Sequence, residues 1–183
     1  KSCPKIFMQM FTIHTIHNNH YIPLIFCLLP NKQKEIYTQT FRMLRNECEK
    51  LNLKFLPQTI YVDFEEAIHS SILSVWPEIN IKGCRFHLGQ SWWRKIQNLG
   101  LTNEYKSDSE LSKYLKYFFG LPFLHPDEVE NCFIEDIMSI QPNDSKIREF
   151  TDYVFDNYIN EESRFPPKIW SEFNASTMRT TNS

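Results

Sequence analysis

The feature that most constrains this chain is a short strand that ends in an acidic residue and turns directly into a helix. Thr59–Val62 is a β-branched and aromatic run, Asp63 follows it, and residues 64–68 take up helical spacing. A second strand pattern at 79–82 leads into Cys84-x-x-His87. Because α/β sheets place their chemistry at the carboxyl ends of strands, these three side chains are the first candidate site residues.

Asp63 also has a purely structural interpretation. An aspartate at the start of a helix commonly caps it, and Glu66, three residues later, would complete a capping-box-like pair. The two interpretations can coexist, since a capping aspartate at a strand-to-helix junction can also face a metal ion.

The first half of the sequence predicts an α/β fold. Residues 5–14 and 21–29 are expected to form an antiparallel hairpin that turns at Asn18-Asn19. Strand 21–29 is apolar on both faces, so we expect both to be covered. Helical patterns at 32–51 (capped by Pro30-Asn31), 64–76 and 87–99 alternate with the two later strands. This order favours a mixed sheet flanked by helices.

The second half reads differently, as an all-α segment. Residues 107–119, 126–140 and 145–158 have helical patterns, and no strand signal appears between 101 and 162. We therefore divide the chain into an α/β core (1–101), a helical insertion (102–165) and a return segment (166–183). The charge changes with this division: the net charge is +5 for residues 1–101, −9 for 102–163 and +2 for 164–183. Contact with a polyanion is thus more plausible for the first segment, while the acidic one resembles a solvated helical surface.

The composition excludes several classes of protein. With only four glycines, the chain contains no glycine-rich phosphate-binding loop. Its five cysteines are odd in number and scattered, which favours a reducing compartment over a disulfide framework. No apolar stretch is long enough to cross a membrane. The chain begins with Lys and has no signal-peptide pattern, so we expect it to be a piece of a longer protein.

Several motifs, taken in order, resemble the catalytic domain of Mutator-like element transposases, the MULE domain. They are residues 1–7, 12–14 and 21–23, Val62-Asp63-Phe64-Glu65 with Ala67, residues 83–87 with Gln90, and Trp170 with residues 179–182. Each motif is weak alone, but their order along the expected strands makes the set more specific.

The resemblance implies an RNase H-like fold in which two Asp and one Glu hold a pair of Mg²⁺ or Mn²⁺ ions. Such a metal pair, roughly 3.5–4 Å apart, activates the attacking oxygen and stabilises the leaving oxygen in DNA cleavage and strand transfer. Asp63 matches the second acid and would be both catalytic and metal-binding. The first acid would precede Lys1 and the third would follow Ser183, so we expect this piece alone to be inactive and to bind no metal tightly.

The same resemblance implies that the strand carrying the first acid is central to the sheet. Without it, the hairpin and the Asp63 strand would each expose an unpaired edge. We expect either that the two halves close this gap or that the piece is only marginally stable.

Two further motifs carry candidate residues. Cys84 and His87 could be half of a zinc site, but zinc needs more ligands than two. We expect instead that Cys84 is buried at the strand end and that His87 caps or hydrogen-bonds near Asp63, and the resemblance implies a supporting role for the pair near the active centre. Residues 79–101 contain four Lys/Arg and no acid, so Arg85, Trp93, Arg94 and Lys95 are candidate DNA contacts. The alternative for Trp93 is packing against the helical insertion.

The leading hypothesis is therefore a fragment of a MULE-type transposase that acts on DNA in the nucleus. The alternative is a domesticated, transposon-derived module that binds DNA or protein without catalysis. A chance likeness on an unrelated α/β scaffold is a third reading. Neither main hypothesis involves a membrane, and self-association into a homo-oligomer stays open.

Overall fold

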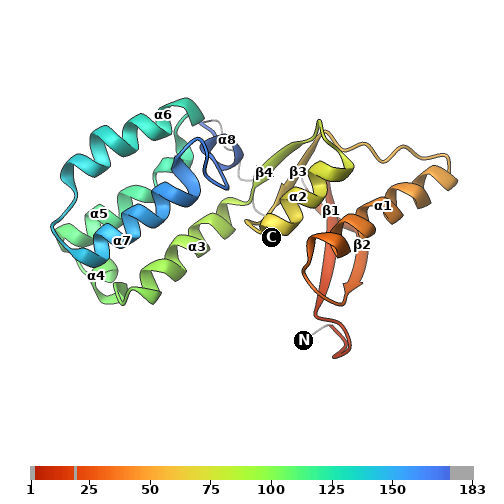
Figure 1. The fold of residues 1–183 in the computed structure, drawn as a ribbon, viewed down its shortest axis with the longest axis horizontal. Helices are drawn as coiled ribbons and strands as arrows, with labels where there is room; N and C mark the ends of the chain where they lie inside the picture. The colour runs from red at the N-terminus through yellow and green to blue at the C-terminus, as the bar shows by residue number, and fades with distance from the viewer. Residues whose placement is uncertain (1–2, 19, 174–183) are drawn as a thin grey trace. The chain divides into compact units, whose positions relative to one another are not determined.

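A computed structural model describes residues 3–18 and 20–173 of the chain (Figure 1). Its strands are β1 (Gln9–His17), β2 (His20–Leu29), β3 (Thr59–Val62) and β4 (Asn80–Gly83). Its α-helices are α1 (Lys34–Lys50), α2 (Glu66–Val75), α3 (Arg85–Asn98), α4 (Thr102–Lys106), α5 (Glu110–Phe118), α6 (Pro126–Asn131), α7 (Ser145–Val154) and α8 (Pro167–Trp170). Short 3₁₀ segments, η1 (Leu121–Phe123) and η3 (Met138–Ile140), and π-helical segments, η2 (Cys132–Ile137) and η4 (Phe155–Ile159), complete the helical part.

The chain forms two compact units, residues 1–81 and 82–182. The division lies earlier than the segment boundary drawn from the sequence at residue 101, because α3 packs with the helices that follow it. The ring of Trp92 on α3 meets those of Phe119, Tyr158 and Trp170 edge-on, at 5.7–5.8 Å between centroids. A helix with this much apolar contact belongs to the helical unit.

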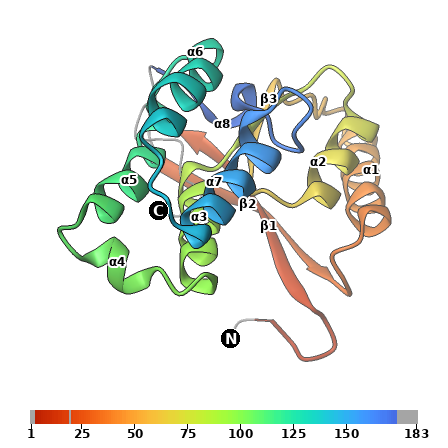
Figure 2. The same cartoon turned by 60° about the vertical axis from the view of Figure 1, so that its left-hand side comes forward.

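The predicted hairpin is confirmed. Strands β1 and β2 pair antiparallel from Gln9 opposite Leu29 to His17 opposite His20, with an irregularity between Ile13 and His14; Figure 2 shows the two strands running side by side. At the turn Asn18 has a φ of 49°, the left-handed conformation that asparagine tolerates.

Only one face of the hairpin is covered within the described residues. Phe11, Ile13 and Cys27 pack against the core, and Leu29 is buried in it. The apolar side chains of the other face, including Leu24 and Phe26, are exposed. The expectation that both faces of β2 are covered is thus wrong for the part of the chain that the structure describes.

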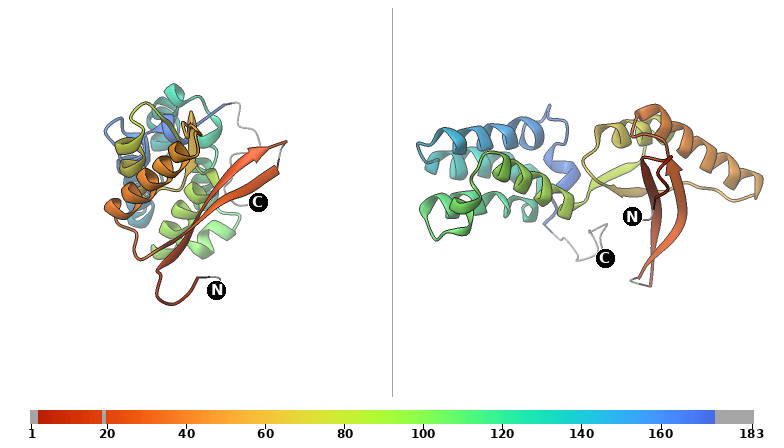
Figure 3. Two further views of the ribbon diagram at one scale, coloured as in Figure 1. Left: turned by 90° about the vertical axis from the view of Figure 1, so that its right-hand side faces the viewer. Right: turned by 90° about the horizontal axis from the view of Figure 1, so that it is seen from below.

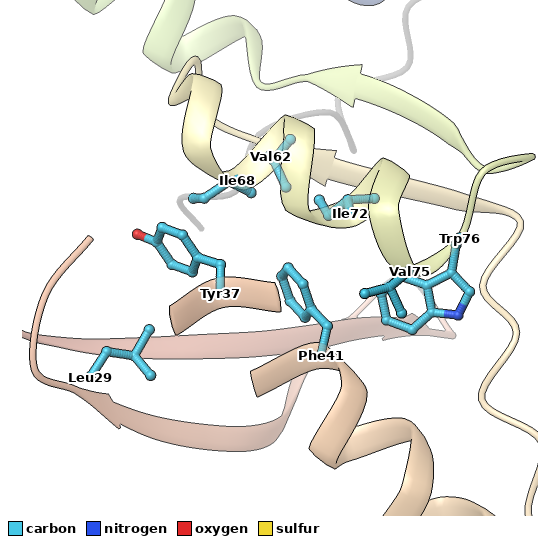
Figure 4. Close-up of a cluster of buried hydrophobic side chains, with 8 residues drawn as sticks. All are labelled: Leu29, Tyr37, Phe41, Val62, Ile68, Ile72, Val75 and Trp76. Carbon is cyan, nitrogen blue, oxygen red and sulfur yellow. The ribbon is translucent and has the colours of Figure 1, made fainter. Parts of the chain in front are cut away.

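The core of the first unit lies between the hairpin and helices α1 and α2 (Figure 4). Tyr37 and Phe41, one turn apart on α1, lie below α2, with Tyr37 on the side of Ile68 and Phe41 below Ile72. The rings of Phe41 and Trp76 lie 5.7 Å apart, and both Tyr37 and Phe41 contact Phe11 of β1 edge-on. This packing is what the three- and four-residue apolar spacing of both helices predicts.

Strands β3 and β4, connected through α2, form a second two-stranded sheet. Both lie within a residue of their predicted positions, and the α/β class is confirmed. Among the described residues the two halves do not close the expected gap, since the β1–β2 pair and the β3–β4 pair are separate sheets. The RNase H-like arrangement stays a prediction.

The second unit contains helices and short helical turns (Figure 3). All three predicted helices are present between residues 107 and 158, but π-helical and 3₁₀ turns interrupt two of them. Within the described residues, no strand occurs between Leu101 and Glu162, as predicted. After α3 the chain turns at Gly100, whose φ of 70° suits glycine. No helix in the described ranges combines the length and the apolarity that a membrane span needs.

Candidate functional site

Asp63 lies directly after β3, where the sequence places it, and its side chain is half-buried. It is not the N-cap of the following helix: α2 begins at Glu66, and the capping position is Glu65, which makes no side-chain capping hydrogen bond. The capping interpretation of Asp63 is therefore wrong, because the turn continues for two residues past it before helical geometry begins.

His69, on α2, fixes the backbone at the end of β3. Its Nε2 lies 2.8 Å from the carbonyl oxygen of Asp63. A carbonyl oxygen only accepts, so Nε2 carries the proton and donates. Burial lowers the pKa of His69, which favours the neutral ring at pH 7. A neutral donor of this kind holds the peptide at Asp63 without placing a positive charge next to it.

Glu65 belongs to a polar network that joins three segments of the first unit. The hydroxyl of Tyr37 donates to Glu65 Oε2 at 3.0 Å and accepts from Gln9 Nε2 at 2.7 Å. Lys32 pairs with Glu65 Oε1. The network therefore links β1, α1 and the junction that carries Asp63. Glu65 is therefore half-buried in this network, whereas Glu66 is exposed in the first turn of α2.

The hydroxyl of Tyr37 is held in its protonated form. Desolvation by burial raises the pKa of Tyr37 to about 12; the hydrogen bond from Gln9 lowers it, and the charge of Glu65 adds to the rise. Because the folded-state pKa is above the unfolded value of about 10, the protonated Tyr37 hydroxyl contributes to the stability of the fold, and this contribution is complete below pH 10. It is lost as the pH rises through 12.

The variant Tyr37→Phe is expected to lower the free energy of unfolding by about 1–3 kcal/mol, because the ring stays buried while Gln9 and Glu65 lose a partner. Urea denaturation followed by circular dichroism measures this difference. The control is Tyr61→Phe on β3, where the ring is exposed; a change below about 0.5 kcal/mol is expected there. Equal effects of the two variants would contradict the network's role.

The Cys-x-x-His pair begins the second unit. Cys84 is fully buried and precedes α3 as its capping residue, and His87 is half-buried one turn further on. The ring of His87 contacts that of Phe86 at 5.5 Å. Since Asp63 belongs to the first unit and this pair to the second, the supporting role of His87 near Asp63 stays a prediction.

The candidate DNA-contacting residues lie along α3. Arg94 is exposed, whereas Trp93 contacts Tyr105 with ring centroids 5.0 Å apart. Lys95 pairs with Glu149 at 2.7 Å, and Arg85 lies over the ring of Phe123. The packing of Trp93 agrees with the alternative interpretation, in which it contacts the helical segment. Of the four, Arg94 is the side chain most available to a phosphate.

Within residues 3–18 and 20–173, no group of three or more His, Cys, Asp or Glu side chains lies close enough to hold a metal ion. The zinc interpretation of Cys84 and His87 therefore finds no further ligands in the described part. The role of Asp63 as a metal ligand stays a prediction.

Comparison with known families identifies the first half of the chain. The family model of the MULE transposase domain matches residues 2–91. This segment, 90 of the chain's 183 residues, is similar to a MULE transposase domain. The resemblance drawn from the motifs between residue 2 and Gln90 is confirmed. No match was found among curated proteins or among solved structures.

The remaining motifs of the resemblance lie beyond the match. Trp170 is fully buried, and its indole N–H donates to the carbonyl oxygens of Phe165 and Tyr158. It therefore has a structural role in the helical unit. Residues 179–182 lie outside the described residues.

Sequence reasoning missed three residues of the site: Gln9, Tyr37 and His69. Tyr37 and His69 sit on the buried faces of their helices, where they read as ordinary core positions. One signal in the sequence could have identified them: a tyrosine and a histidine fall on the apolar faces of two successive helices. Because buried polar groups need hydrogen-bond partners, these two residues could have been expected to make polar contacts.

Proposed function

We propose that this chain is part of a DNA transposase and that the complete protein cuts DNA and joins strands with two Mg²⁺ or Mn²⁺ ions. The observation that carries the proposal is the MULE match over residues 2–91, which contains Asp63 at the end of β3. Transposase chemistry of this kind makes DNA the substrate and the nucleus the place of action.

Asp63 is the proposed metal ligand supplied by this chain. When bound, the metal ions would activate the attacking oxygen and stabilise the leaving oxygen. The chain's contribution is to hold the carboxylate at a strand end whose backbone is tied to His69. Glu65 does not substitute for a further metal ligand, because Lys32 and Tyr37 already engage both of its oxygens.

We propose that in the complete protein both small sheets belong to one RNase H-like sheet. In support, β1 and β3 each have a single hydrogen-bonded strand neighbour among the described residues. A strand from elsewhere in the protein would pair with both and bring a further acid next to Asp63. The 183-residue chain alone then lacks nuclease and strand-transfer activity and binds no divalent ion tightly.

The experiment compares this chain with the longer reading frame that contains it. Supercoiled plasmid is incubated with each protein and Mg²⁺ or Mn²⁺, and nicked and linear products are measured. Cleavage by the longer protein alone is the expected result. Binding of DNA by the longer protein without metal-dependent cleavage would instead support the alternative, a domesticated binding module. Metal-dependent nicking by the 183-residue chain, lost in Asp63→Ala, would contradict the inactivity of the piece.

A further inference from the structure

An ammonium group and a phenol meet the carboxylate of Glu65 at the junction between β3 and α2, two residues after Asp63. Lys32, in the loop between β2 and α1, pairs with Glu65 Oε1. Tyr37 on α1 donates to Glu65 Oε2 at 3.0 Å, and Gln9 on β1 donates in turn to Tyr37. Three segments of the first unit therefore converge on this one side chain.

Glu65 occupies the capping position of α2, but its carboxylate does not cap that helix. Its backbone carbonyl accepts from the amides of Ile68 and His69 and so starts the helix. A polar side chain at this position commonly accepts from the first free amides of its own helix. The carboxylate of Glu65 makes no such bond and contacts Tyr37 on α1 instead. Its partners are therefore α1 and the loop before α1, rather than α2.

The carboxylate of Asp63 belongs to the same neighbourhood. Two residues of chain span at most about 7 Å, so Asp63 and Glu65 are close through the backbone. Burial is the main cause of the raised pKa of Tyr37, and the charges of Glu65 and then of Asp63 add to it. The hydroxyl of Tyr37, which lies at the edge of the apolar cluster on the side of Ile68 (Figure 4), thus senses both carboxylates.

The partner that Lys32 takes matters for a metal ligand at this junction. The four-carbon stem of a lysine is flexible, so its ammonium group can move between carboxylates that lie a few ångströms apart. A cation within about 4–6 Å lowers the proton affinity of an aspartate by about tenfold or more. The affinity of the same carboxylate for a divalent cation falls for the same electrostatic reason. An ion pair between Lys32 and Asp63 would therefore compete with metal binding.

We propose that Glu65 is a positioning residue for Asp63, which holds Lys32 in an ion pair and so leaves the Asp63 carboxylate available to divalent cations. The proposal rests on the proposed function, in which Asp63 is a metal ligand. Tyr37 holds the second oxygen of Glu65 and keeps the carboxylate turned toward α1. Glu65 thus acts on Asp63 through Lys32, whereas His69 acts on its backbone.

The first test needs no metal ion and uses the 183-residue chain. A crystal structure of Glu65→Gln is compared with that of the unmodified chain. Glutamine can still accept from Tyr37 through its amide oxygen, but it has no charge to hold Lys32. We expect Lys32 Nζ to move to within about 4 Å of a carboxylate oxygen of Asp63. A Lys32 side chain that stays at residue 65 or turns into solvent would overturn the proposal.

The second test measures Mn²⁺ binding to the longer protein by isothermal titration calorimetry. Glu65→Gln is expected to weaken binding by about tenfold. Adding Lys32→Met to this variant removes the competing ammonium group, so binding should return to within about a factor of two of the unmodified protein. The matched controls are Glu66→Gln and Lys34→Met, which remove the same charges at exposed positions nearby and should leave binding unchanged.

Plasmid cleavage by the same variants separates positioning from a structural role. Glu65→Gln is expected to raise the Mg²⁺ concentration at the half-maximal rate by about tenfold. The rate at saturating Mg²⁺ should stay within about a factor of two of the unmodified protein, because excess metal displaces Lys32 from Asp63. A residue that the fold needs, or a metal ligand, would lower the saturating rate as well.

Three results would overturn the positioning role while the proposed function stands. They are metal binding that depends on Asp63 but not on Glu65, a loss in Glu65→Gln that Lys32→Met does not reverse, and a large fall in the saturating rate. A longer protein that binds no Mn²⁺, with or without Asp63→Ala, would instead show that the proposed metal site is wrong, and the positioning role with it.

Discussion

Replacing Asp63 by asparagine in the longer protein is expected to lower the rate of metal-dependent DNA cleavage by about a thousandfold. Asparagine keeps the shape of the side chain but removes the negative charge that a divalent ion needs. Stabilisation of transition-state charge by a bound metal is worth several kcal/mol, and each 1.36 kcal/mol corresponds to about a factor of ten. Plasmid cleavage over time at saturating Mg²⁺ measures the rate.

The matched control for this variant is Glu66→Gln. Glu66 is three residues away, exposed in the first turn of α2, and loses the same charge. We expect cleavage by Glu66→Gln to stay within about a factor of two of the unmodified protein, since an exposed first-turn carboxylate interacts only weakly with the helix dipole. Circular dichroism confirms that both variants fold. Similar losses in both variants would assign the effect to general electrostatics rather than to a metal ligand.

Replacing Trp92 by alanine is expected to lower the free energy of unfolding of the helical unit by about 3–5 kcal/mol. Its ring is completely buried and meets three other aromatic rings edge-on, those of Phe119, Tyr158 and Trp170. Its removal leaves a cavity and also forfeits three ring–ring contacts. Because a folded domain is stable by only about 5–15 kcal/mol, this loss is a large part of the total.

The neighbouring tryptophan provides the control. Trp93 is half-buried, and its ring contacts that of Tyr105. Trp93→Ala is therefore expected to cost about 1 kcal/mol. Urea denaturation followed at 222 nm, where helices dominate the circular dichroism signal, compares the two variants. A larger loss in Trp93→Ala than in Trp92→Ala would mean that the arrangement of α3 in the helical unit is wrong.

The local elements follow closely from the sequence. The hairpin at Asn18, helix α1, strand β3 and the absence of strands between 101 and 162 in the described residues all agree with pattern and turn chemistry. These features depend on interactions between residues that are close in sequence. Asn31 is a partial exception: its side chain accepts from the backbone N–H of Gln33, and Gln33 is the capping position of α1. Asparagine side chains form such local turns as readily as they cap helices. The sequence therefore identified where the strand ends, but not which residue occupies the capping position of α1.

The assignment of α3 shows what a pattern along one chain cannot decide. Its apolar stripe, with Trp92 and Ile96, predicts a buried face but not the surface against which that face packs. Rings from positions 119, 158 and 170 surround Trp92 in the structure. Contacts over such separations depend on how all the helices assemble.

By itself the sequence determined the order of the elements, the place of Asp63 at a strand end and the likeness of residues 2–91 to the MULE transposase domain, because local spacing and motif order carry this information. Only the tertiary structure decided that Glu65 is engaged by Lys32 and Tyr37, that His69 holds the backbone of Asp63, and that α3 belongs to the helical unit. The physical reason is that partners for buried polar and apolar groups come from segments distant along the chain, and only folding brings those segments together.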